Sequence, residues 1–150
     1  MFSGRRWWIS QLLFRGVAAL IPAEGVIFLP DLISHGGDGG QAAATKLVDS
    51  IRREFKSKFE LDLDQMHLWV HVFYNKRGLM GALGKAGHQV AMQKLEDFAH
   101  GFNRAADRFV MVDVGPGKEA ADVKIKVMLE DNIRLGQTCK ILFGGGIFCT

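Results

Sequence analysis

The hydrophobic residues of the chain form short continuous runs in some places and a helical spacing in others. Four runs are apolar, rich in β-branched or aromatic residues, and interrupted by few polar positions. They cover 17–21, 66–75, 108–114 and 138–143. Each has the length and composition of a buried strand. Because helical stretches separate them, they predict a parallel central sheet of about four strands flanked by helices.

The longest helical pattern begins at Gln41 and is closed by the segment LDLDQ at 61–65. Apolar residues recur there at every fourth position, which predicts one face toward a core. These residues are Leu47, Ile51, Phe55 and Phe59. Further helices are predicted at 93–103, with Leu95, Phe98 and Phe102 turned inward, and at about 118–133. The glycine content of HGGDGGQ at 35–41 predicts a loop.

Composition narrows the class of protein only modestly. The 150 residues suit one domain, and the net charge of +3 weakly favours anionic partners such as RNA. The two cysteines have no spacing typical of a zinc site, and no apolar run is long enough to span a membrane. We expect a lead-in at 1–16, a domain at 17–150, and a nuclear or cytoplasmic location. A mitochondrial presequence is the alternative reading of the arginine-containing start.

Acidic residues follow several of the predicted strands. Glu24 comes after the first, Asp113 lies near the end of the third, and Glu119 and Asp122 begin the next helix. Strand ends of a parallel sheet meet at one edge, so these carboxylates could hold Mg²⁺ or Mn²⁺, and Lys118 could neutralise a phosphate. The alternative is structural, since acids also stabilise the N-terminus of a helix. The GPGK turn at 115–118 lacks the spacing of a phosphate-binding loop.

Four motifs occur in an order that resembles a known family. They are LIPAEGVIF, VFYNKRGL, LEDFAHGFN and VDVGPGKEAADVKI. Together they are similar to the PIN-like, NYN-type domain of fungal CCCH zinc-finger proteins, over about 17–143. The resemblance implies a Rossmann-like three-layer fold related to metal-dependent ribonucleases. It implies Asp122, Asp113 and Glu24 as catalytic residues, and Asp122, Glu24 and Glu119 as ligands of Mg²⁺ or Mn²⁺.

The sequence departs from that family pattern at both ends. The family's first strand typically ends in DGDG, whereas this chain has PAEG, so that Glu24 replaces the second aspartate. The acid that follows the family's last strand has no counterpart in ILFGGGIFCT, and the accompanying zinc fingers are absent from this sequence. We therefore expect a C-terminally truncated, degenerate domain with a weakened metal site.

These features lead to three alternative functions. The first is a PIN-like domain that binds RNA or a protein partner without cutting. The second is an active ribonuclease that cleaves single-stranded RNA, and the third is an unrelated nucleotide-binding domain. Basic residues expected to contact RNA or phosphate are Lys118, Lys76, Arg77, Arg52, Arg53 and Lys56. Exposed aromatic rings would favour single-stranded RNA, but Trp69 and Tyr74 lie in a strand and are predicted to be core residues.

Overall fold

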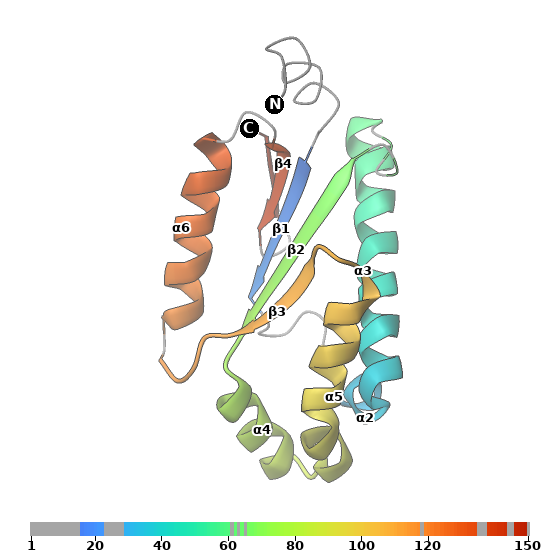
Figure 1. The fold of residues 1–150 in the computed structure, drawn as a ribbon, viewed down its shortest axis with the longest axis vertical. Helices are drawn as coiled ribbons and strands as arrows, with labels where there is room; N and C mark the ends of the chain where they lie inside the picture. The colour runs from blue at the N-terminus through green and yellow to red at the C-terminus, as the bar shows by residue number, and fades with distance from the viewer. Residues whose placement is uncertain are drawn as a thin grey trace, which may run out of the picture.

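A computed structural model describes residues 16–22, 29–60, 62, 64, 66–117, 119–134, 138–143 and 146–149 of the chain. It has the predicted α/β architecture, with one sheet between two layers of helices (Figure 1). The strands are β1 (Gly16–Pro22), β2 (His67–Tyr74), β3 (Phe109–Asp113), β4 (Thr138–Phe143) and β5 (Gly146–Cys149). The helices are α2 (Pro30–Ser34), α3 (Gly36–Phe59), α4 (Lys76–Lys85), α5 (Gln89–Ala105) and α6 (Ala120–Arg134).

The sheet has the strand order β3-β2-β1-β4-β5. Strands β1 to β4 run parallel to one another, which confirms the predicted parallel sheet. A fifth strand, β5, follows the four predicted ones and pairs with β4 in the antiparallel direction. That strand has only four residues and lies in a glycine-rich stretch, so its hydrophobic pattern is too short to identify it.

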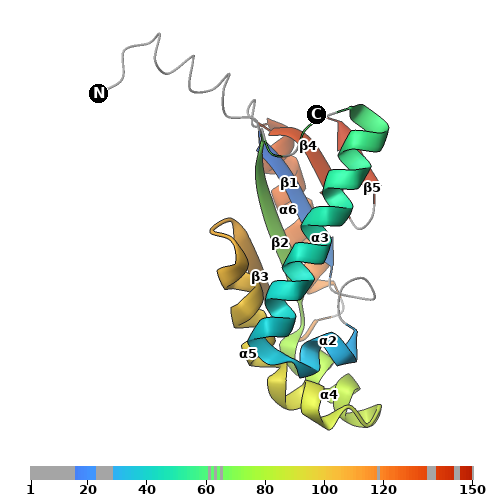
Figure 2. The ribbon, with the colours of Figure 1, turned by 90° about the vertical axis from the view of Figure 1, so that its right-hand side faces the viewer.

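Two hydrophobic clusters lie on opposite faces of the sheet. The larger cluster joins the sheet to α2, α3, α4 and α5, which Figure 2 shows on one side of it. Its largest fully buried side chains include Phe55, Leu95, Phe98 and Phe102, as the helical spacing predicted. The smaller cluster lies on the other face, where Ile125 of α6 packs against Leu20 and Phe73 of the sheet. The three layers therefore follow from apolar residues on both sides of the parallel strands.

The glycine-rich segment at 35–41 is not a loop, contrary to the prediction. Residues 36–41 form the first turns of α3, and His35 alone separates α2 from α3, with a positive φ of 59° at Gly36 where the chain changes direction. A Cβ atom on Gly40 would lie 2.0 Å from the carbonyl oxygen of Phe98 in α5. A Cβ on Gly101 of α5 would lie 2.0 Å from the carbonyl oxygen of Gly37. The glycines therefore allow α3 and α5 to approach closely.

The side chain of Asn103 protects the outer edge of β3. Its Oδ1 accepts a hydrogen bond of 2.7 Å from the backbone N–H of Met111, and the N–H of Phe109 donates to the carbonyl of Ala106. Two outward N–H groups of an edge strand are thus satisfied within the chain.

We predict that Asn103→Ala lowers the free energy of unfolding by about 1–2 kcal/mol, because the Met111 N–H loses its partner. Urea titration followed by circular dichroism measures the change. Asn103→Asp keeps an acceptor at the same position and serves as the control. An equal loss in both variants would contradict a role for the hydrogen bond.

Candidate functional site

The carboxyl ends of β1 to β4 lie at one edge of the sheet, and the strand order reverses between β1 and β4. In open α/β sheets this reversal is where ligands usually bind. Residues 23–28 follow β1 and residues 144 and 145 follow β4, and both segments lie outside the described residues. The prediction for Glu24 therefore stays a prediction.

Asp113 ends β3 at this edge, as expected. Its Oδ1 accepts two backbone hydrogen bonds, from the N–H of Lys76 at 3.1 Å and from the N–H of Gly115 at 3.0 Å. Asn75 caps α4 in a similar way, since its Oδ1 accepts from the N–H of Gly78 at 3.1 Å. One oxygen of Asp113 therefore joins the segments that follow β2 and β3, which gives this carboxylate a structural role.

Tyr74 connects Asp113 to an acid that the sequence analysis missed. Burial and the carboxylates of Asp113 and Glu96 raise the pKa of the Tyr74 hydroxyl. Tyr74 is only 6% exposed, as predicted for a core residue, and Glu96 of α5 also lies 3.8 Å from the Nζ of Lys76. Two carboxylates from different elements thus act on one buried hydroxyl. No local sequence motif marks Glu96 as a site residue, because only the packing of α5 against the sheet brings it close to Tyr74.

The remaining predicted acids lie near the start of α6. Asp122 is in its first turn and Glu119 directly precedes it, and both are exposed. Lys118 lies outside the described residues. The glycine turn before α6 is confirmed, with positive φ angles at Gly115 and Gly117. Within the described part of the chain, no three His, Cys, Asp or Glu side chains gather closely enough to hold a metal ion.

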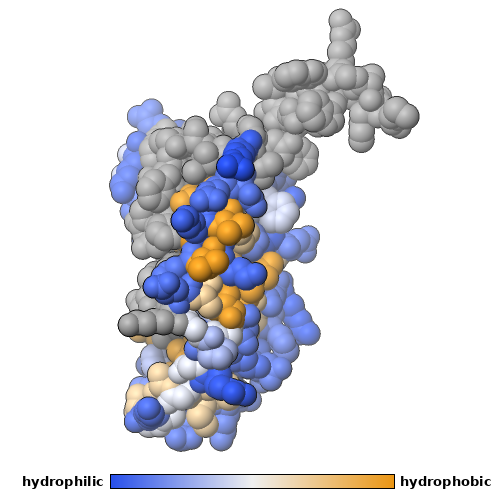
Figure 3. Space-filling view, turned by 90° about the vertical axis from the view of Figure 1, so that its left-hand side faces the viewer, coloured by the Kyte–Doolittle hydropathy of each residue, from blue (hydrophilic) through white to orange (hydrophobic). Residues whose placement is uncertain are grey.

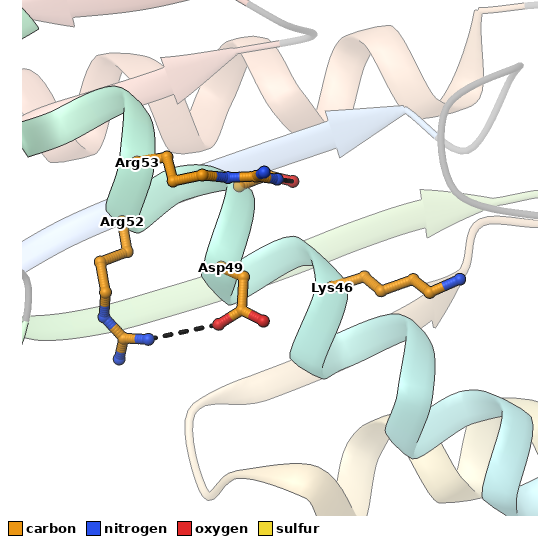
Figure 4. Close-up of a pocket in the computed structure, with 5 residues that line it drawn as sticks. Lys46, Asp49, Arg52 and Arg53 are labelled. Atoms are coloured by element: carbon orange, nitrogen blue, oxygen red, sulfur yellow. Dashed lines mark hydrogen bonds and ion pairs between the residues drawn. The ribbon is translucent and has the colours of Figure 1, made fainter. Parts of the chain in front are cut away.

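The predicted basic residues fall into two separate groups. Lys76 and Arg77 begin α4 at the carboxyl edge, whereas Arg52, Arg53 and Lys56 lie on α3, which runs toward the opposite edge of the sheet (Figure 1). A hollow of about 510 Å³ is bordered by Lys46, Asp49, Ser50, Arg52 and Arg53 (Figure 4). Arg52 is already paired, at 3.3 Å with Asp49 and 2.9 Å with Asp64. The two groups do not form one basic surface.

Trp69 is exposed, which corrects the prediction that it belongs to the core. Its side chain is 47% exposed, and the guanidinium of Arg108 lies 5.4 Å from the centre of its ring. The strand period explains the error. Val70 and Val72 face the large cluster, so Trp69, His71 and Phe73 must face the other side of the sheet. The alternation shows which residues share a face with Trp69, but it does not show how far that face is covered by helices.

His71 lies on the same side of β2, stacked beside Phe73 with the ring centres 6.2 Å apart. Its Nδ1 is buried without a hydrogen-bond partner, the one such side-chain atom found in the described ranges. Burial lowers the pKa of His71 from its ordinary 6.5. The folded protein thus disfavours the protonated imidazole.

We therefore predict that the free energy of unfolding falls as the pH is lowered through about 6.5, because the unfolded chain then binds a proton at His71 that the folded chain resists. Urea titrations between pH 5 and pH 8, roughly the range in which histidine titrates, measure the slope. His71→Phe should flatten it, whereas His100→Gln, at an exposed position of α5, should not. The same slope in His71→Phe would contradict the assignment.

The fold defines the chain as a three-layer α/β domain with a mostly parallel sheet. The chain belongs to the family described as "Domain of unknown function (DUF7923)", whose model matches residues 15–147. No curated protein and no solved structure shows significant similarity to it. None of the helices in the described ranges is both long and apolar enough to cross a membrane.

Proposed function

We propose that this chain is a PIN-like, NYN-type domain that binds single-stranded RNA without cutting it. The observation that carries the proposal is the exposed Trp69 ring with the Arg108 guanidinium over it. Bases of single-stranded RNA stack on exposed aromatic rings and on arginine planes. This pair offers both kinds of surface at one place, with Trp69 on β2 and Arg108 directly before β3.

The positive charge of the chain favours binding of RNA over binding of an uncharged partner. The chain carries a net charge of +3, and Arg108 places a cation directly at the stacking surface. Cations attract the phosphate backbone, and the resulting affinity falls as the salt concentration rises. The basic residues of α3 and α4 would contribute at longer range, because they lie on other parts of the molecule.

The proposal is tested by fluorescence anisotropy with a labelled single-stranded oligouridine. We expect binding that weakens with salt, and competition by unlabelled single strand at least about tenfold better than by duplex RNA of the same length. Equal competition by the duplex would contradict stacking as the mode of binding. An anisotropy that does not change at any protein concentration would overturn the proposed function.

A metal-dependent ribonuclease is the second candidate, favoured by one specific observation. The carboxylates of Asp113 and Glu96 both raise the pKa of Tyr74 at the carboxyl edge, which is where ligands of open α/β sheets usually bind. Asp122 lies in the first turn of α6, and this helix starts at the same edge (Figure 1). These acids do not by themselves gather closely enough to hold a metal ion within the described ranges, so this candidate requires Glu24, which lies outside them, to complete a Mg²⁺ or Mn²⁺ site that activates water.

For this candidate we predict Mn²⁺-dependent cleavage of single-stranded RNA that is lost in Asp113→Asn and in Asp122→Asn. Asparagine at 113 keeps an oxygen for the N–H groups of Lys76 and Gly115, so only the charge is removed. Asp97→Asn, at an exposed site of α5, is the control. Binding without cleavage would favour the first proposal. Cleavage that survives both variants would show that Asp113 and Asp122 are not catalytic.

A further inference from the structure

Helix α6 is apolar on two opposite sides. Ile125 is 1% exposed and packs on Leu20 and Phe73 of the sheet. Val123 and Val127, each two residues away from it, point the other way and are 58% and 50% exposed. Residues four apart share one face of a helix, so the two valines form an outer stripe. Figure 3 shows hydrophobic side chains in a band on this side of the molecule, between hydrophilic ones.

Charged residues flank this stripe in a regular arrangement. Lys124 and Asp131 are seven residues apart and share one flank, whereas Lys126 and Glu130 are four apart and share the other. All four are exposed, and none makes an ion pair within the described ranges. On each flank the lysine lies toward the start of the helix and the acid toward its end.

We propose that the outer stripe of α6 binds the α6 of a second copy of this chain, in the antiparallel direction across a two-fold axis. When two antiparallel helices face each other, each flank meets the same flank of its partner. Lys124 then lies opposite Asp131 of the second copy, and Lys126 opposite Glu130. The midpoint of both pairings falls within one residue of Val127, so the two Val127 side chains meet at the axis.

The same charges exclude the parallel arrangement. In parallel helices each flank meets the other flank at the same height, which sets Lys124 opposite Lys126 and Asp131 opposite Glu130. Like charges in contact are unfavourable and select against that orientation. Surface ion pairs add little affinity, so burial of Val127 at the axis supplies the attraction and the charges fix the direction. Such an isologous contact is closed and stops at a dimer.

The test is sedimentation equilibrium of the whole chain at several concentrations. For so small a stripe we expect a monomer–dimer equilibrium with a dissociation constant of about 1–100 μM. Val127→Lys should weaken it at least about thirtyfold, because the charge is introduced twice at the axis. Val90→Lys makes the same change at a similarly exposed valine of α5, which is 57% exposed, and should leave the dimer intact.

A charge exchange tests the direction of pairing. The variant Lys124→Glu/Lys126→Glu and the variant Glu130→Lys/Asp131→Lys should each remain monomeric, whereas their mixture should associate. All of these positions are exposed, and thermal unfolding followed by circular dichroism confirms that the variants are folded. Three results would overturn the proposal: a monomeric wild type throughout, equal effects of Val127→Lys and Val90→Lys, or a mixture that stays monomeric.

Discussion

Gly101→Ala is expected to destabilise the protein by about 3 kcal/mol, which lowers the melting temperature by about 10 °C. The added Cβ would lie 2.0 Å from the carbonyl oxygen of Gly37 and 2.6 Å from its Cα. Both atoms belong to the backbone of α3, so no side chain can rotate away. Helices α3 and α5 must separate, and the buried Phe98 and Phe102 then lose contacts.

Gly81→Ala is the matched control, because it makes the same change in an exposed part of α4. A Cβ there meets nothing within 4 Å. Alanine is the better helix former, so we expect this variant to gain up to about 1 kcal/mol. Calorimetry or urea titration compares the two. A loss in Gly81→Ala as large as that in Gly101→Ala would show that the effect does not come from the helix contact.

Trp69→Ala is expected to weaken binding of single-stranded RNA by about 10-fold to 100-fold, the range that loss of one base–aromatic stack produces. Trp69 is 47% exposed and carries the Arg108 guanidinium over its ring, so its removal takes away both the stacking surface and the support of the cation. Anisotropy titration against labelled oligouridine measures the change.

Two substitutions separate stacking from charge. Trp69→Phe keeps an aromatic face and should retain most of the affinity, whereas Arg108→Lys keeps the charge but loses the planar group that stacks. Leu29→Ala, at another exposed hydrophobic residue, should have no effect. If Trp69→Ala binds as tightly as Leu29→Ala, the ring does not take part in RNA binding.

The four parallel strands were predictable because each is a short apolar run that the sheet buries. Helix α5 was also predictable, since Leu95, Phe98 and Phe102 lie at helical spacing, although the helix extends beyond 93–103 at both ends. The segment at 35–41 was not, because glycine there permits contact between helices as well as turns. Local composition does not distinguish the two uses, and only the position of α5 decides.

The candidate sites depend still more on contacts between distant residues. A parallel sheet brings the carboxyl ends of its strands to one edge, so the position of Asp113 was predictable. Glu96 was not, because its place beside Tyr74 depends on how α5 packs. Trp69 was misplaced because a continuous apolar strand hides which face is covered. The exposure of the outer valines of α6 was unpredictable for the same reason. An apolar helical pattern does not show how many sides of the helix are buried.

The Trp69–Arg108 surface is the proposed contact with RNA. Ultraviolet crosslinking of the wild-type protein to single-stranded oligouridine, followed by mass spectrometry of the peptides, tests this contact. We expect crosslinks at Trp69 that unlabelled single strand competes away. Crosslinks confined to the basic residues of α3 and α4, with none at Trp69, would contradict it.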